Sequence, residues 1–414
     1  MKKFTNAVIY GHDSANEILV EKGIIKKIGT NLGPASETID LNGKMICSPY
    51  VDPHLHLDYV YTLSELGQDG AGTGTLFEAI EMWPKFKETL TIESVKRLAM
   101  KGIIDEVSNG VQYIRTHIDV TDPSFTGLKA MLELKEELKE KVDIQIVAFP
   151  QQGMYTYRGG RELVEEALKM GADVVGGIPH YEPAREFGEQ SIHEIVDLAL
   201  RYEKLIDVHC DETDDPQSRF VELLNALVLM EDYGPKTTAS HTCSFGSADN
   251  SYAFRMLDLF KKSGINFISC PTENVYLQGR QDSYPKRRGI TRVKEFKDYG
   301  INIAFAQDSI NDPWYPMGNG NMMNVLDNGI HLAQIMSPKD IETDLDLITY
   351  NGAKCMNIED TYGLREGNDA NFIVLNGNSP FDVIRNRANV LASVRKGEYL
   401  FKQRPVEYDV KLNL

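Results

Sequence analysis

The chain has 414 residues, and 42% of them are hydrophobic, which is enough to fill the core of one large domain with an accessory part, or of two domains. The net charge is −17 and no basic stripe runs along the sequence, so nucleic acid is not an expected partner. No uncharged apolar run reaches the length of about 18 residues that a membrane-spanning helix needs, so the sequence predicts no membrane span.

Both ends of the chain carry short strand-like segments separated by polar turns. The first of them, at residues 3–10, has no long apolar stretch of the kind found in a signal peptide, and we interpret it as a strand. Similar segments recur from about residue 365 onwards. We therefore expect residues 1–50 and 365–414 to form a small β-sandwich domain built from both termini.

The region between them, residues 51–364, alternates short apolar runs rich in β-forming residues with amphipathic helical stretches. We count eight such runs. One of the helices is expected to begin at Thr91, whose side chain can cap the first turn, with Ser94 three residues on. Eight strands alternating with helices predict an α/β fold of the (β/α)8 TIM-like barrel type.

The five cysteines are widely spaced and form no C-x-x-C pair. Their number and spacing argue against structural disulfides and against a cysteine zinc site. A reducing, cytoplasmic location suits such a sequence. The cysteines are Cys47, Cys210, Cys243, Cys270 and Cys355.

Polar side chains gather where the predicted barrel strands end, which is the catalytic face of this architecture. Six of the nine histidines lie at such ends. A single histidine at a strand end is usually structural, but six at one rim indicate a shared site. They are His54, His56, His117, His180, His209 and His241.

The pair His54 and His56 stands in the run VDPHLHLDYV. Residues i and i+2 of a strand point to the same side, so both imidazoles can bind one ion. His209 after the fifth strand and Asp308 after the eighth would complete a set of three nitrogens and one oxygen. Such a set suits one divalent ion, zinc or iron, which lowers the pKa of a bound water towards 7.

Four further groups can handle protons or a substrate edge. Glu212 follows His209 by three residues and is the best candidate for a general acid and base. His241 can orient the attacking water, and Asp308 can accept its proton while binding the ion. Gln151 offers a donor and an acceptor in one amide, which suits a cyclic ureide or amidine edge.

Ordered motifs along about 350 residues resemble the amidohydrolase superfamily, and within it the bacterial cytosine deaminases. The pattern includes H-x-H after strand one, histidines after strands five and six, and an aspartate after strand eight. The motifs that carry the resemblance are PYVDPHLHLD, GTLFEAIEMW, YIRTHIDVTD, QIVAFPQ, IDVHCDETDD, TASHT, LQGR, YPKRRGITRVKE and DPWYPMGNGNM.

The resemblance implies a site with one metal ion, because the fourth strand ends in GGIPH and offers no lysine to bridge two ions. It assigns the metal ligands to His54, His56, His209 and Asp308, the proton shuttle to Glu212, the position beside the attacking water to His241, the reading of the pyrimidine edge to Gln151, and the pocket walls to Leu76, Phe149 and Trp314. It also implies a homo-oligomer, often a hexamer, acting on a small heterocyclic substrate.

The sequence departs from the family pattern at three places. Ser309 replaces the second of two consecutive aspartates, which lies near the amino group and C5 of the substrate, so the pocket is expected to be roomier there. Gln152 replaces a glutamate. Thr272 and Glu273 replace an apolar pair, and Glu273 should either reach solvent or meet a cationic or N–H-rich ligand.

These features predict a metal-dependent hydrolase that deaminates a small cyclic amidine and releases ammonia. Cytosine is the first expectation for the substrate, followed by creatinine, which would give N-methylhydantoin, and then by 5-methylcytosine. A different class, the cyclic amide hydrolases of the dihydroorotase or hydantoinase kind, shares the H-x-H barrel but usually binds two ions. A barrel that only binds ligands is disfavoured by the complete set of ligands and proton-transfer groups.

Overall fold

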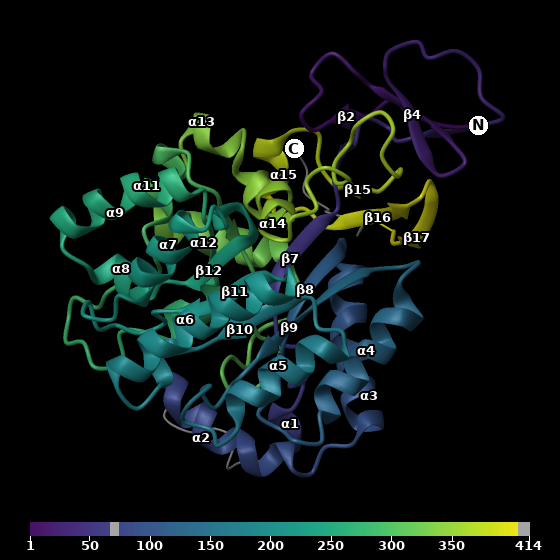
Figure 1. Cartoon of the computed structure of the whole chain (residues 1–414). Coiled ribbons are helices and arrows are strands. Elements are labelled where there is room, and N and C mark those ends of the chain that lie inside the picture. The colour runs from purple at the N-terminus through teal and green to yellow at the C-terminus, as the bar shows by residue number, and fades with distance from the viewer. Residues whose placement is uncertain (67–73, 405–414) are drawn as a thin grey trace, which may run out of the picture.

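The computed structural model describes residues 1–66 and 74–404 and shows a barrel of eight parallel strands, as predicted (Figure 1). Neighbouring strands follow one another in chain order. The strands are β7 (Tyr50–Leu55), β8 (Val111–Asp119), β9 (Asp143–Phe149), β10 (Val174–Gly177), β11 (Leu205–Cys210), β12 (Thr237–His241), β13 (Asn266–Ser269) and β14 (Ile303–Phe305).

The first and last barrel strands meet just beyond β14. Leu55 and Asp308 form a parallel bridge. The amide of Asp308 donates to the carbonyl of His54 over 2.9 Å, and the amide of His56 donates to the carbonyl of Asp308 over 3.1 Å. The closure of the barrel therefore joins the backbone of three predicted site residues.

Helices surround the barrel, and the loops and short helices after the strands build its rim (Figure 1). The helix α3 begins after Thr91, whose hydroxyl accepts from the amide of Ser94 while the Ser94 hydroxyl accepts from the amide of Thr91, so the predicted cap is present. The helices are α1 (Leu63–Leu66), α2 (Leu76–Lys87), α3 (Ile92–Ser108), α4 (Thr126–Leu138), α5 (Gly160–Met170), α6 (Arg185–Tyr202), α7 (Phe220–Met230), α8 (Cys243–Ser247), α9 (Asn250–Ser263), α10 (Pro271–Leu277), α11 (Val293–Tyr299), α12 (Met322–Ala333), α13 (Pro338–Ile341), α14 (Tyr350–Cys355) and α15 (Pro380–Arg385).

The two ends of the chain form two further sheets beside the barrel. The first has the order β4-β3-β1-β5, and the second, β17-β16-β15-β6-β2, takes strands from both ends. The Phe4 and Phe372 rings pack edge to face between them, 4.8 Å apart. The strands are β1 (Lys2–Thr5), β2 (Val8–Ile9), β3 (Glu17–Glu21), β4 (Ile24–Gly29), β5 (Glu37–Asp40), β6 (Met45–Cys47), β15 (Phe372–Leu375), β16 (Val390–Arg395) and β17 (Glu398–Lys402).

This arrangement confirms the predicted accessory sheets from both termini. The division into domains at residues 50 and 365 stays a prediction, and residues 405–414 lie outside the described part of the chain.

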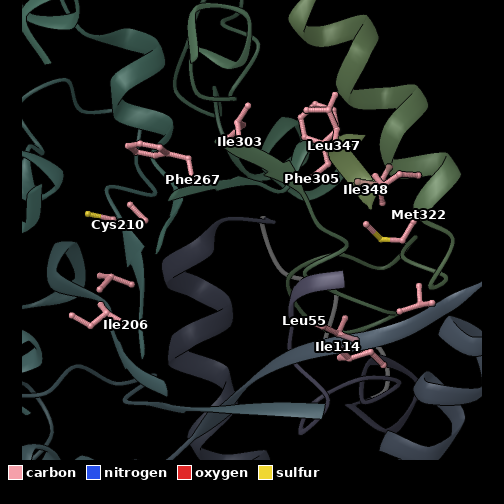
Figure 2. Packing of buried hydrophobic residues seen from close by; sticks show 14 of the residues in the cluster. Leu55, Ile114, Ile206, Cys210, Phe267, Ile303, Phe305, Met322, Leu347 and Ile348 are labelled. Atoms are coloured by element: carbon pink, nitrogen blue, oxygen red, sulfur yellow. The ribbon is translucent and has the colours of Figure 1, made fainter. Parts of the chain in front are cut away.

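The large hydrophobic core lies between the barrel strands and the helices around them. Leu55, the last residue of β7, lies between His54 and His56 and points into this core. Val208 and Cys210, the neighbours of His209, do the same. Figure 2 shows part of the cluster, with Leu55 and Cys210 labelled. Because side chains alternate along a strand, burying Leu55 outwards turns His54 and His56 towards the barrel interior.

All five cysteines are buried and unpaired, as the sequence predicts. No helix among residues 1–66 and 74–404 combines the length and the apolar composition that crossing a membrane requires.

Candidate active site

Three imidazoles and one carboxylate converge at the carboxyl ends of β7, β11 and β14. Nε2 of His209 lies 3.2 Å from Nε2 of His54 and 3.0 Å from Nε2 of His56. Oδ1 of Asp308 lies 3.5 Å from Nε2 of His54 and 3.4 Å from Nε2 of His56. All four side chains are buried, so the predicted ligand set is brought together away from bulk water.

The spacing and chemistry of this cluster are compatible with a divalent metal ion. Tetrahedral ligands at zinc–nitrogen distances of about 2.0–2.1 Å stand about 3.4 Å apart, close to the separations seen here. Burial lowers the pKa of His54, His56 and His209 well below the usual range, so their nitrogens are neutral and keep lone pairs. Without an ion, the lone pairs of these three Nε2 atoms would face one another, and an ion bound between them would satisfy all three.

The other predicted rim histidines lie around this cluster. The His117 ring packs 4.0 Å from the His54 ring, and neither of its nitrogens has a hydrogen-bond partner among the described residues. His180 follows β10 in a short helical turn, where burial lowers its pKa to about 3. His241 ends β12, with its ring 4.9 Å from the ring of His209.

A group of buried carboxyls faces the cluster from the other side. Carboxylate oxygens of Glu212, Glu273 and Asp308 all lie within 4.8 Å of one another. Burial raises the pKa of Glu212 well above its usual range, and the nearby Glu273 adds to this. The pKa of Glu273 is also raised, first by burial and then by Asp308. Protons or a cation are therefore needed to make three carboxyls compatible with this dry site.

The expectation that Glu273 reaches solvent is wrong. Its side chain is 3% exposed and its Oε2 has no hydrogen-bond partner among the described residues. The reason is that a short helix, α10, follows β13 directly and turns Glu273 towards Asp308. The alternative of a cationic or N–H-rich ligand for Glu273 remains a prediction.

Asn274 was not singled out from the sequence, yet it connects two candidate catalytic groups. Its Nδ2 lies 3.1 Å from Oε1 of Glu212 and 3.2 Å from Nδ1 of His241. The side chain is fully buried. One amide nitrogen with two hydrogens can donate to both partners, which holds Glu212 and His241 in a fixed relation. The sequence carries no periodic signal for this contact, because the contact depends on where α10 begins.

Ser309 follows Asp308 and is fully buried, and its hydroxyl has no hydrogen-bond partner among the described residues. Gln151, two residues beyond the end of β9, is also buried, with Oε1 unpartnered in the same sense. Gln152 behaves differently, because its Oε1 accepts from Lys87 over 3.2 Å. Unmet polar atoms at Ser309 and Gln151 are what a polar ligand would satisfy.

An aromatic and aliphatic cluster forms the wall beside the histidines. Phe149 stacks on the His209 ring, with centroids 4.1 Å apart and planes 18° from parallel. Leu76 and Trp314, the other two predicted wall residues, belong to the same cluster as Phe149. Tyr59 was missed by the sequence reasoning, and its ring stacks between His56 and Trp314 at 4.5 Å and 4.3 Å. The wall suits a flat ring.

A cavity of about 330 Å³ lies over the rim and has both Leu76 and Glu212 in its lining. The remaining lining comes from Thr75 and Phe77 beside Leu76, from the loop after Glu212, and from the end of α10 with the segment that follows it, including Arg280 and Arg287. Of the three buried carboxyls, Glu212 is the one that lines this cavity.

Comparison with known families matches the amidohydrolase family model to residues 37–401. The N-isopropylammelide isopropyl amidohydrolase of Pseudomonas sp. (strain ADP) is 30% identical over 403 residues, which are 96% of each chain. The pterin deaminase of Rhizobium rhizogenes is 25% identical over 395 residues, covering 94% of this chain and 88% of that protein.

Among solved structures, the 5-methylcytosine deaminase of Klebsiella pneumoniae is 45% identical to this chain. Its complex with 5-fluorocytosine superposes with a TM-score of 0.96 and covers 99% of this chain and 100% of that one. Its complex with phosphonocytosine gives a TM-score of 0.94 and covers 98% and 100%. The similarity extends through every element that builds the candidate site.

Proposed function

Because the chain belongs to the amidohydrolase family, we propose that it is a hydrolytic deaminase of a cytosine-like ring. The observation that carries this proposal is the position of Glu212 and His241. They lie beside Asp308, opposite three histidines that suit one divalent ion. His54, His56, His209 and Asp308 would hold that ion, zinc or iron.

The described residues offer no group for a second, lysine-bridged ion, since no lysine is among their buried polar side chains. This favours one ion per chain and disfavours the cyclic amide hydrolases as a class. Metal analysis of the purified protein tests it, and two tightly bound ions per chain would restore that class.

In the reaction, water adds to the amidine carbon of the ring, and the exocyclic carbon–nitrogen bond then breaks. When bound, the ion acts as a Lewis acid that lowers the pKa of the attacking water. Oδ2 of Asp308 makes no hydrogen bond among the described residues and accepts a proton from that water.

Glu212 completes the proton transfers. Burial raises the pKa of Glu212, which favours the protonated carboxyl that can donate to the ring nitrogen. The ionised carboxylate then takes the proton of the added hydroxyl group and passes it to the exocyclic nitrogen, which leaves as ammonia. The proton held by Asp308 returns to Glu212, whose oxygens lie within 4.8 Å of those of Asp308, and restores the starting state.

His241, whose Nδ1 lies 3.5 Å from Glu212, orients the water. Gln151 binds the polar edge of the ring, and Phe149 and Trp314 cover its faces.

The preferred substrate we propose is 5-methylcytosine rather than cytosine, which the sequence alone placed first. Ser309 supports this choice, because a small buried residue stands where the family resemblance places a carboxylate near C5. The 45% identity to a 5-methylcytosine deaminase over nearly the whole chain supports it as well. Glu273 is then the acceptor for N–H groups on this side of the ring.

Steady-state ammonia release from cytosine, 5-methylcytosine and creatinine tests the substrate. We expect the largest kcat/KM for 5-methylcytosine, by a factor of roughly 10–200 over cytosine, which is the range for one methyl group in a fitted pocket. Turnover of creatinine without turnover of either pyrimidine would overturn the proposal in favour of the creatinine alternative.

Ser309→Asp tests the role of the serine. The added carboxylate should occupy the space beside C5 and shift the ratio of kcat/KM values towards cytosine. Ser309→Ala is the matched control, because it keeps the space and adds no charge, and it should retain the preference for 5-methylcytosine. An unchanged ratio in Ser309→Asp would show that this residue does not set the substrate.

Two further properties follow from the resemblance and from the cysteines. A homo-oligomer, with a hexamer as the family form, is proposed, and light scattering of the purified protein tests it. The five unpaired cysteines favour a reducing cytoplasm as the working compartment.

A further inference from the structure

A chain of hydrogen bonds runs beneath the candidate metal ligands, through the barrel interior. Nη1 of Arg115 donates to Oδ2 of Asp207 over 2.9 Å. The hydroxyl of Ser240 donates to Oδ1 of Asp207 over 2.6 Å. The same hydroxyl oxygen lies 2.9 Å from Nδ1 of His54. All four side chains are fully buried, and they come from four different strands, β8, β11, β12 and β7.

The direction of each bond follows from the charge at the far end. A guanidinium always carries its proton, and a buried one needs an ionised partner, so Asp207 is a carboxylate and can only accept. Ser240 has one hydroxyl hydrogen, and the carboxylate takes it. Towards His54 the hydroxyl therefore has only lone pairs to offer, and Nδ1 of His54 must be the donor.

We infer that Arg115, Asp207 and Ser240 are positioning residues that hold the His54 imidazole as its Nδ1–H tautomer. The Nε2 lone pair then faces His209 and Asp308, where a metal ion would bind. The inference rests on the metal site of the proposed function, and it concerns the binding of the ion rather than the identity of the substrate.

The need to balance the charge of Arg115 does not explain the hydrogen bond between Ser240 and His54. The guanidinium is already bound by Oδ2 of Asp207, by the carbonyl of Cys355 over 2.7 Å and by Oε1 of Gln145 over 3.1 Å. Ser240 instead uses the second carboxylate oxygen and links it to His54. If Asp207 and Ser240 served only to balance the charge of Arg115, the hydrogen bond between Ser240 and His54 would not be needed. Losing that hydrogen bond would then leave metal binding unchanged.

Ser240→Ala tests the inference by removing the acceptor for Nδ1–H. The metal-free protein is titrated with zinc in competition with a chromophoric chelator. We expect the zinc affinity to fall roughly 10–100-fold, the usual effect of losing an outer hydrogen bond to a metal ligand. Ser240→Thr restores a hydroxyl and should restore the affinity.

Ser269→Ala is the matched control. Ser269 is also a fully buried serine, at the end of the barrel strand β13, but its hydroxyl has no hydrogen-bond partner among the described residues. It should bind zinc as the wild type does. Equal affinity in Ser240→Ala and the wild type would overturn the inference, and because no substrate is used, that result leaves the proposed deaminase activity untouched.

A second measurement leaves Arg115, Asp207 and Ser240 unchanged, so it tests the inference even if Ser240→Ala does not fold. Long-range proton–nitrogen spectra of metal-free wild-type protein labelled with 15N-histidine report which nitrogen of each imidazole is protonated. The signals of His54 are assigned by their loss in His54→Gln. We expect Nδ1–H, and an Nε2–H tautomer at His54 would overturn the inference.

Discussion

The histidine side of the site and its carboxyl side differ in how their polar groups are held. On the histidine side, backbone hydrogen bonds link His54 and His56 to Asp308, three residues after the end of β14, and the Ser240 hydroxyl lies 2.9 Å from Nδ1 of His54. On the carboxyl side, Glu273 Oε2 and the Ser309 hydroxyl have no hydrogen-bond partner among the described residues. Under the proposed function, the histidine side would set the type of reaction, and the carboxyl side would set which molecule reacts.

The largest effect should come from the histidine side. His209→Gln removes one ligand, so bound metal should fall well below one ion per chain, and kcat/KM should fall by at least about 10³-fold, since a Lewis acid contributes several kcal/mol. Metal analysis and steady-state kinetics measure the two. His180→Gln, outside the ligand cluster, is the control and should keep its metal. Full metal content in His209→Gln would contradict the ligand assignment.

Glu212→Gln should separate the two sides. The ion is expected to stay, because Glu212 is not among the ligands, while turnover should fall by roughly 10²–10⁴-fold, the usual contribution of a proton-transfer group. Metal content and kcat measured on the same preparation give the comparison. Near-normal turnover would remove Glu212 from the mechanism.

Asn274→Ala should have a smaller effect of the same kind. Losing a hydrogen bond to a charged or catalytic group costs about 1.5–3 kcal/mol, equivalent to a fall in kcat of roughly 10–150-fold. Metal content should stay at the wild-type value, because Asn274 touches only Glu212 and His241 of the proposed machinery. A fall in metal content instead would mean that Asn274 supports the ligands and not the proton transfer.

The smallest effect concerns stability at the edge of the carboxyl side. Burial raises the pKa of Asp312 from 3.8 to about 7, although it accepts from the amides of Trp314 and Tyr315. A raised pKa means that the wild-type fold loses stability as the pH rises from about 4 to about 7, where the unfolded chain is ionised and the folded one is not.

Asp312→Asn keeps the acceptor oxygen and cannot ionise. Its melting temperature relative to the wild type should therefore rise between pH 4 and pH 7 and then level off. Thermal melts of both proteins across this range measure the difference. A difference that does not change with pH would show that Asp312 ionises normally in the folded protein.

The barrel and the convergence of its ligands were predictable because they rest on periodic signals. Alternation along β7 places His54 and His56 on one side, and the carboxyl ends of parallel strands meet at one rim, so His209 and Asp308 could be added from their strand positions alone. The accessory sheets were predictable from the short strands and polar turns at both ends.

Side-chain partners within the rim were not predictable in the same way. The contact of Asn274 with Glu212 depends on a single residue separating α10 from the end of β13, and no periodicity in PTENVYL indicates the direction of its third and fourth residues, Glu273 and Asn274. Ser240 looked like an ordinary strand residue, because its role depends on Asp207 and Arg115, which are distant in the sequence. The burial of Glu273 was not predictable either, because it depends on where α10 begins.

The junction between Leu55 of β7 and Asp308, three residues after the end of β14, has a consequence for assembly. This seam of the barrel is short, and an ion bound by His54, His56 and Asp308 would cross-link its two edges. His54 is made early in synthesis and Asp308 late, so the ring can close only after most of the chain exists. In the accessory sheet, the pairing of β6 with β15 likewise joins an early segment of the chain to a late one. A metal-free barrel should accordingly open first at this seam, and loading with metal should protect the amides of His56 and Asp308 from hydrogen exchange more than those of the opposite strands.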